Sequence, residues 1–189
     1  MPTNLSIIIY VASPIDYARY RHTAIFLEYP TFPPSPASPP TSSLSHSLSS
    51  SPPTTTTSTS TCISTTTTLL EIAGGYGFFT FVETPHHILP PSTSPPPIMT
   101  ITKTGTKEIA KIIPLAAIPD SITPGAVRMA VMSTPINNGD MDWNCQNWVG
   151  DVLGRLVRKG MLSDEDRERG VDLMVEGVLE ARDEWLVEC

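Results

Sequence analysis

The 189-residue sequence has no hydrophobic run long enough to span a bilayer. Its longest apolar stretch, SIIIYVA from Ser6 to Ala12, is far shorter than the roughly 20 residues that a transmembrane helix needs. No lysine or arginine precedes this stretch, which argues against a secretory signal. The sequence therefore predicts an intracellular, cytoplasmic protein without a membrane span.

Positive charge is also scarce. Twelve lysine and arginine residues face 19 aspartate and glutamate residues, which gives a formal net charge of −7. A chain of this charge has no general electrostatic attraction to nucleic acid or anionic lipid. We therefore expect no nucleic-acid partner.

Cysteine is rare and unpaired in the sequence. Cys62, Cys145 and Cys189 are an odd set at wide spacing, with no CxxC pair and no histidine at metal-ligand distance. This pattern argues against a disulfide framework and against a zinc site, and it fits free thiols in a reducing compartment. We expect neither a metal nor an organic cofactor.

Proline, serine and threonine are concentrated in two segments. Residues 30–68 have no hydrophobic periodicity and few large apolar side chains, so they predict a disordered Ser/Thr/Pro-rich insertion in a single domain of residues 1–189. Such an insertion is either a tolerated low-complexity expansion or a substrate for phosphorylation or glycosylation. Residues 84–97 predict a second, proline-rich loop.

The N-terminal part of the chain reads as two strands. Residues 4–14 and 20–30 are short segments with β-branched or aromatic residues, and both are bounded by proline. Both features favour buried strands over helices.

Three glycines separate the next two apolar runs. Residues 69–83 (LLEIAGGYGFFTFVE) contain Gly74, Gly75 and Gly77, which predict a strand, a tight turn and a second strand. One or two further strands are expected, around 98–103 and 108–113. Residues 121–135 fit either a short helix from Pro124 or a strand.

The last quarter of the sequence has the periodicity of two amphipathic helices. Apolar residues recur at steps of three and four after Asp142, Gly160 ends the first helix, and Ser163 is the N-cap of the second. The fold class is therefore α+β, a small antiparallel β-sheet packed with a C-terminal helical hairpin. The expected apolar positions are Cys145, Trp148, Val149, Val152, Leu153, Leu156 and Val157 in the first helix, and Val171, Met174, Val175, Val178, Leu179 and Trp185 in the second.

Cys145 is the candidate nucleophile. A thiol in the first turn of a helix lies near unpaired N–H groups and the positive end of the helix dipole, which favour the thiolate. His22 is the histidine expected on a strand, whereas His46, His86 and His87 lie in proline-rich segments. A strand imidazole beside a helix N-terminus is an arrangement of thiol and general base.

Two sequence blocks resemble a known class of thiol enzymes. RHTAIFLE (21–28) and NCQNW (144–148) resemble circularly permuted papain-like proteins, including the lecithin retinol acyltransferase-like and NlpC-like enzymes, in which the histidine also precedes the cysteine. Together with LLEIAGGYGFF (69–79), these blocks also resemble a group of uncharacterised fungal proteins with a Cys-Gln-aromatic helix. The resemblance implies a permuted papain-like fold and a Cys145–His22 pair.

The same resemblance suggests roles for three polar residues. The acyltransferase-like enzymes carry a second histidine, and the best-matching position here is Glu71, whose carboxylate can orient an imidazole. The backbone N–H of Cys145, with a side-chain amide from Gln146 or Asn144, would form an oxyanion hole. Alternatively, Glu71 is a solvated strand residue, Asn144 only a helix cap and Gln146 only a surface amide.

Two functions follow from these alternatives. In the first, the protein is a thiol hydrolase or acyltransferase that acts on the amide, ester or thioester carbonyl of a small-molecule or peptide substrate. In the second, it is a catalytically inactive member of the same fold that serves as a protein-interaction module, because a fold alone does not establish a function. Neither the substrate nor the oligomeric state is specified by the sequence.

Overall fold

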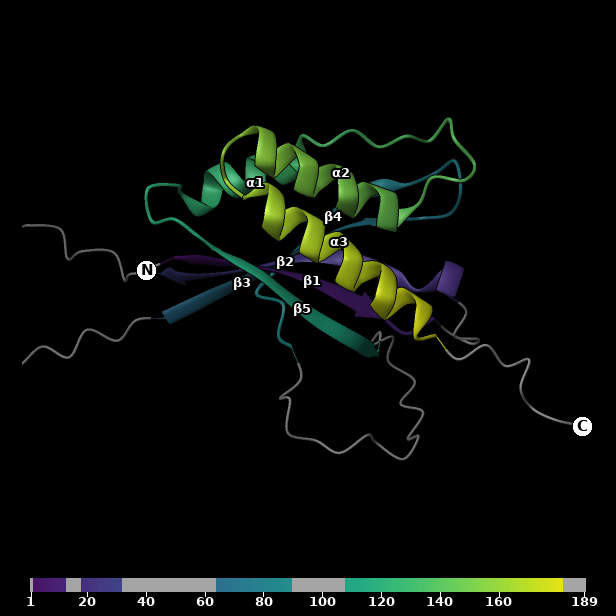
Figure 1. Cartoon of the computed structure of the whole chain (residues 1–189), viewed down its shortest axis with the longest axis horizontal. Helices are drawn as coiled ribbons and strands as arrows, with labels where there is room; N and C mark the ends of the chain where they lie inside the picture. Colours follow the sequence, from purple (N-terminus) through teal and green to yellow (C-terminus); the bar gives the residue numbers. More distant parts are fainter. Residues whose placement is uncertain (1, 13–17, 32–63, 90–107, 182–189) are drawn as a thin grey trace, which may run out of the picture.

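One antiparallel sheet and one layer of helices make up the part of the chain that the computed structural model describes, residues 2–12, 18–31, 64–89 and 108–181 (Figure 1). Within these residues the fold is α+β, as the sequence predicts. The elements are β1 (Thr3–Tyr10), the 3₁₀ turn η1 (Ala18–Tyr20), β2 (His22–Thr31), β3 (Ser64–Ala73), β4 (Thr80–Pro85), β5 (Ile109–Ile118), α1 (Pro124–Met132), α2 (Cys145–Arg158) and α3 (Asp164–Leu179).

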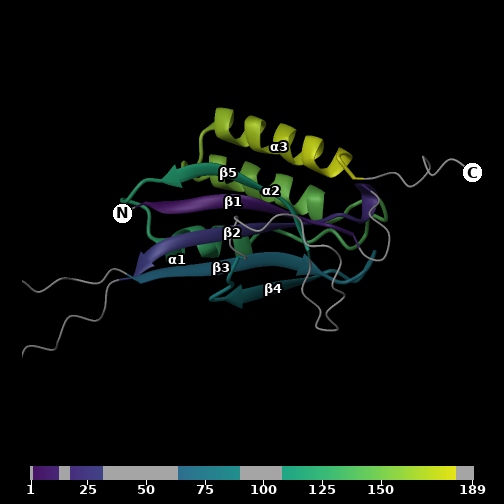
Figure 2. The same cartoon turned by 90° about the horizontal axis from the view of Figure 1, so that it is seen from below.

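The five strands are arranged in the order β4-β3-β2-β1-β5, and every neighbouring pair is antiparallel. Figure 2 shows this order from the face that the helices leave open. The helices lie together on the other face. There α2 packs on β2, α3 on β5 and β1, and α1 on α2.

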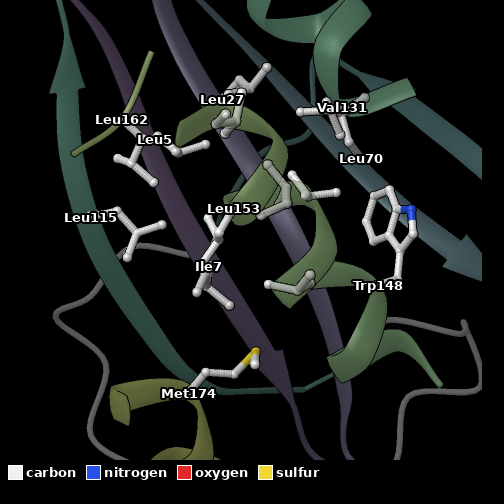
Figure 3. Close-up of a cluster of buried hydrophobic side chains, with 14 of the residues drawn as sticks. Leu5, Ile7, Leu27, Leu70, Leu115, Val131, Trp148, Leu153, Leu162 and Met174 are labelled. Atoms are coloured by element: carbon white, nitrogen blue, oxygen red, sulfur yellow. The ribbon is translucent and has the colours of Figure 1, made fainter. Parts of the chain in front are cut away.

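The main core lies between the sheet and the helices. Alternate residues of a strand point to opposite faces, so Ile7 of β1 joins the cluster that contains Trp148 and Leu153 of α2 (Figure 3). Ile8, the next residue, joins a smaller buried cluster on the opposite face with Tyr10 and Phe26. A strand that buries both faces explains the continuous apolar run in β1.

The strands extend into both segments that the sequence predicts to be loops. β2 continues through Thr31 and β3 begins at Ser64, so the ends of the 30–68 segment are paired strands. Threonine is β-branched and favours strands. The threonine run of 65–68 therefore forms part of β3 rather than a loop. Thr84 and Pro85 likewise belong to β4. Residues 32–63 and 90–97 lie outside the described residues.

β5 is longer than predicted, and it tolerates a proline. It runs to Ile118 rather than ending near 113. Pro114 pairs with Ser6, and a register shift between Leu5 and Ser6 accommodates Leu115. Proline is compatible with an edge strand or a bulge. The strand expected at 98–103 lies outside the described residues.

The helix boundaries largely follow the sequence signals. Residues 124–132 form α1, the helical alternative, with Thr123 as N-cap and proline at its first position. Gly160 follows α2 with a φ of 67°, the left-handed conformation expected after a helix end. Ser163 caps α3 through the N–H of Asp166. Trp185 lies outside the described residues.

The buried face of α3 differs from the prediction. The sequence predicts that Val175 and Leu179 are buried, but they are 49% and 69% exposed. The helix instead packs through Gly170, Met174, Gly177 and Val178, because it approaches the sheet closely. A Cβ at Gly177 would lie 2.6 Å from Cδ1 of Ile9. Hydrophobic periodicity does not reveal a packing face built on glycine.

No α-helix in the described ranges combines the length and the apolar character needed to cross a membrane.

The turn between β3 and β4 requires glycine, and the residues that follow it contact the segment between α1 and α2. Gly74 has a φ of 128°, and a Cβ there would lie 2.4 Å from the carbonyl oxygen of Phe78. Beyond the turn, Phe79 packs edge-on against Trp143 with ring centroids 5.9 Å apart. The side-chain amide of Asn138 also exchanges two hydrogen bonds with the Phe79 backbone, at 2.8 and 3.1 Å.

We expect Gly74→Ala to lower the free energy of unfolding by about 1–3 kcal/mol, because the new methyl group meets backbone at an unfavourable φ. Gly75→Ala is the matched control, since nothing lies within 4 Å of its Cβ position. Urea denaturation of both variants measures the difference. Equal stability of the two variants would contradict this account of the turn.

Candidate active site

Cys145 is the first residue of α2, and Asn144 caps the helix before it. The Asn144 side-chain oxygen accepts hydrogen bonds from the N–H groups of Gln146 and Asn147, at 2.8 and 3.3 Å. The Asn147 side chain accepts in turn from the Asn144 N–H at 3.0 Å. This reciprocal cap fixes the start of α2 and so fixes the position of Cys145.

The Cys145 sulfur lies against the backbone at the start of β2. The Thr23 N–H donates to Sγ at 3.4 Å, and the thiol points to the Arg21 carbonyl oxygen at 3.9 Å. The residue is 8% exposed. The sulfur is therefore buried, but it contacts backbone polar groups of Arg21 and Thr23, the residues directly before and after His22 in the sequence.

His22 is held between Glu71 and Cys145. Its Nε2 lies 2.6 Å from Oε2 of Glu71, and both side chains are largely shielded from solvent, with 21% and 10% exposed. His22 also lies close enough to Cys145 to lower the pKa of its thiol. The structure thus brings Cys145, His22 and Glu71 together.

The environment of Cys145 favours its thiolate. Burial raises the pKa of the thiol, but the hydrogen bond and charge of His22, with the Thr23 N–H, more than compensate, so the pKa lies below its usual value. A depressed pKa is the mark of a nucleophilic cysteine. A carboxylate at the position of Glu71, 2.6 Å from Nε2, favours the protonated form of an imidazole.

Tyr10 packs on the other side of the imidazole. It pairs with His22 across β1 and β2, and the two rings stack with centroids 5.8 Å apart and planes at 28°. Burial and the nearby charge of Glu71 raise the pKa of Tyr10 to about 12. The phenol therefore stays neutral at physiological pH and limits rotation of the His22 ring.

The structure assigns Gln146 a different role from the expected one. Its Nε2 donates to the carbonyl oxygens of Ala18 and Arg21, at 3.3 and 3.4 Å. These contacts use the donors of the amide to hold the backbone that precedes His22, so Gln146 does not serve as an oxyanion donor in this arrangement. Asn144 acts as the helix cap. The Cys145 backbone N–H is the remaining donor of the expected set.

Arg21 is a site neighbour that the sequence analysis missed. It is buried, and its guanidinium donates to the carbonyl oxygens of Gly177 at 2.6 Å and Glu180 at 3.5 Å. These carbonyls belong to the end of α3, where a helix leaves acceptors unpaired. Arg21 therefore attaches α3 to the residue directly before His22.

The other two histidines in the described part of the chain, His86 and His87, do not join this site. His87 packs edge-on against Phe26, with ring centroids 6.3 Å apart, and His86 follows β4. Within the described part of the chain, no three histidine, cysteine or acidic residues are placed to hold a metal ion. His46, Cys62 and Cys189 lie outside the described residues.

Comparison with protein-family models, curated proteins and solved structures gives no match for this chain.

The lowered pKa of Cys145 predicts a specific pH dependence of alkylation. The rate with iodoacetamide should reach half its maximum below the usual thiol pKa of about 8.5. His22→Ala should move this midpoint upward, above the usual value, because burial then dominates. Each unit of increase should cost about tenfold in rate near neutral pH, since only the thiolate reacts.

Mass spectrometry of the labelled peptides separates Cys145 from Cys62 and Cys189, which act as reference thiols in the same sample. His87→Ala is the matched control and should leave the Cys145 midpoint unchanged. Equal, slow labelling of all three cysteines would show that Cys145 is not activated.

Proposed function

We propose that the protein is a thiol hydrolase or acyltransferase with a circularly permuted papain-like arrangement. The observation that supports this most directly is the position of His22, in contact with the Glu71 carboxylate and the Cys145 thiol at once. Nucleophile, base and orienting group then follow the pattern of a catalytic triad. The order of histidine and cysteine in the chain agrees with the permuted family.

The proposed first step is acylation of Cys145. The thiolate attacks the carbonyl carbon of an amide, ester or thioester, and the carbonyl oxygen becomes an oxyanion. The Cys145 N–H at the start of α2 stabilises this charge. The tetrahedral intermediate collapses by breaking the bond to the leaving group, and the His22 imidazolium transfers its proton to that group.

The second step releases the acyl group. Neutral His22 accepts a proton from water in a hydrolase, or from an acceptor alcohol, amine or thiol in an acyltransferase. The resulting nucleophile attacks the thioester carbonyl, and the Cys145 sulfur leaves as thiolate. Glu71 is a positioning residue that stabilises the imidazolium during both steps. No metal or organic cofactor takes part in this scheme.

A non-catalytic interaction module of the same fold is the second candidate function. The low exposure of Cys145, 8%, favours it, because a nucleophile needs access to its substrate. Exposed apolar side chains on α3 also favour an interaction module. Val175 and Leu179 are exposed and line a shallow hollow together with Glu176 and Glu180. Exposed apolar surface rimmed by polar groups is common at protein interaction sites.

Acyl transfer to the protein separates these two functions. The full chain is incubated with p-nitrophenyl esters of increasing acyl length, an acyl thioester and an activated peptide amide, and intact mass is recorded. An acyl adduct on Cys145 that is absent from Cys145→Ala supports the enzyme. If no donor modifies wild-type protein faster than Cys145→Ala, the interaction module is supported instead.

Two further variants test the roles in the proposed site. We expect His22→Ala to slow acylation by roughly 10²- to 10⁴-fold, the usual contribution of a positioned acid–base group. Glu71→Gln keeps a polar partner for the imidazole but removes the charge, so acylation should slow by at least about tenfold. Acylation rates from quenched samples measure both effects.

Glu28→Gln is the matched control for Glu71→Gln, because Glu28 is also a strand glutamate and contacts Asn4 rather than His22. Its acylation rate should equal that of the wild type. A Glu71→Gln variant as fast as this control would remove Glu71 from the mechanism.

A further inference from the structure

Two arginines, one from each helix, converge where α2 and α3 pack together, and a third lies near one of them on α2. A Cβ at Gly154 of α2 would lie 3.5 Å from Nη1 of Arg158 and 3.6 Å from Nε of Arg167. Arg158 belongs to α2 and Arg167 to α3, so two guanidinium groups converge over one backbone position that lacks a side chain. Arg155 lies three residues before Arg158 on α2, and residues at this spacing are neighbours on a helix surface. We call Arg155, Arg158 and Arg167 the arginine cluster.

The arginine cluster differs from every other arginine in the described ranges. Arg19, Arg21, Arg128 and Arg169 each donate hydrogen bonds to a protein oxygen. The three cluster residues make neither a hydrogen bond nor an ion pair with any described residue. Moreover, the Nε atoms of Arg155 and Arg167 are buried without a hydrogen-bond partner there. Buried donors are normally paired, so unpaired ones call for an explanation.

Neighbouring acidic residues do not supply the missing partners. Asp151 lies one helical turn before Arg155 and Asp164 one turn before Arg167, yet neither is within the 4.0 Å of an ion pair with them. The Asp151 carboxylate accepts instead from Trp143 Nε1 at 3.4 Å. In a chain of net charge −7, three arginines without a carboxylate partner are unusual.

The dipole of α2 explains only part of this arrangement. Arg155 and Arg158 lie in its last turn, where positive side chains are favoured by the negative end of the helix. That preference provides no acceptor for the two buried Nε atoms. It also gives no reason for Arg167, which lies in the first turns of α3, to approach the guanidinium group of Arg158.

We infer that the arginine cluster binds a phosphate group, either inorganic phosphate or the phosphomonoester of a small molecule. Planar guanidinium groups donate paired hydrogen bonds that match the oxygens of a phosphate. A dianion beside Arg158 and Arg167 accepts hydrogen bonds from their guanidinium groups and offsets the repulsion between the two charges. Arg158 lies thirteen positions after Cys145 on α2, which places this site about 20 Å from the thiol, so the inference does not depend on the proposed function.

Thermal unfolding of the full chain tests this site. Sodium phosphate is titrated against sodium chloride at equal ionic strength, and the melting temperature is recorded. A ligand that binds only the folded state raises that temperature, so wild-type protein should show a saturable increase with phosphate beyond that with chloride. Arg158→Gln/Arg167→Gln should weaken the apparent affinity at least tenfold. Arg19→Gln, an arginine outside the cluster, should retain the wild-type response.

A second measurement addresses the stability of the double variant itself. Without phosphate and at low salt, it should melt at the same temperature as the wild type or higher, because the mutual repulsion of the cations is reduced. Isothermal titration calorimetry with inorganic phosphate and with glycerol phosphate then identifies the source of the phosphate. Tighter binding of glycerol phosphate indicates a phosphomonoester ligand, and tighter binding of inorganic phosphate indicates the free anion.

Equal stabilisation of the wild type by phosphate and chloride would overturn the inference. The same conclusion would follow if the double variant bound phosphate as tightly as the wild type, or if Arg19→Gln lost as much affinity as the double variant.

Discussion

The packing of one face of α2 against the sheet is the contact on which the rest of the structure depends. Trp148, Val149, Val152, Leu153 and Leu156 are all fully buried, and burial of such a side chain contributes about 1.5–3 kcal/mol. This face determines where the helix lies, and the Asn144 cap determines where it begins. The position of the Cys145 sulfur at the start of β2 follows from these two constraints.

The candidate site lies where three element ends meet, the N-terminus of α2, the start of β2 and the C-terminus of α3. Arg21 joins all three, since its side chain donates to α3 while its carbonyl oxygen accepts from Gln146 and Cys145. The sheet adds Glu71 from β3 and Tyr10 from β1 on either side of the imidazole. Backbone groups and rigid strands, rather than a flexible loop, therefore hold the reactive groups in place.

The sequence predicts those features of the site that depend only on residues close together in the chain. The 3.6-residue period and the caps locate α2 and the start of α3, and they place Cys145 in the first turn of a helix. The glycine face of α3, the exposure of Val175 and Leu179, and the contacts of Gln146 and Arg21 depend on the distance between helix and sheet. Strand pairing of Thr31 with Ser64 depends on a partner many residues away. Neither hydrophobic periodicity nor a helix cap indicates how closely a helix approaches the sheet or which distant strand a segment pairs with.

The two outer strands of the sheet carry the prolines described above, Pro114 within β5 and Pro85 at the end of β4. A strand at a sheet border exposes backbone donors and acceptors that can template the addition of a strand from another molecule. Proline removes one donor from each border, and the displaced register around Leu115 makes that border irregular. Self-association through continuous intermolecular β-pairing is thereby disfavoured, even though long threonine-rich stretches of the chain have a high intrinsic preference for extended structure.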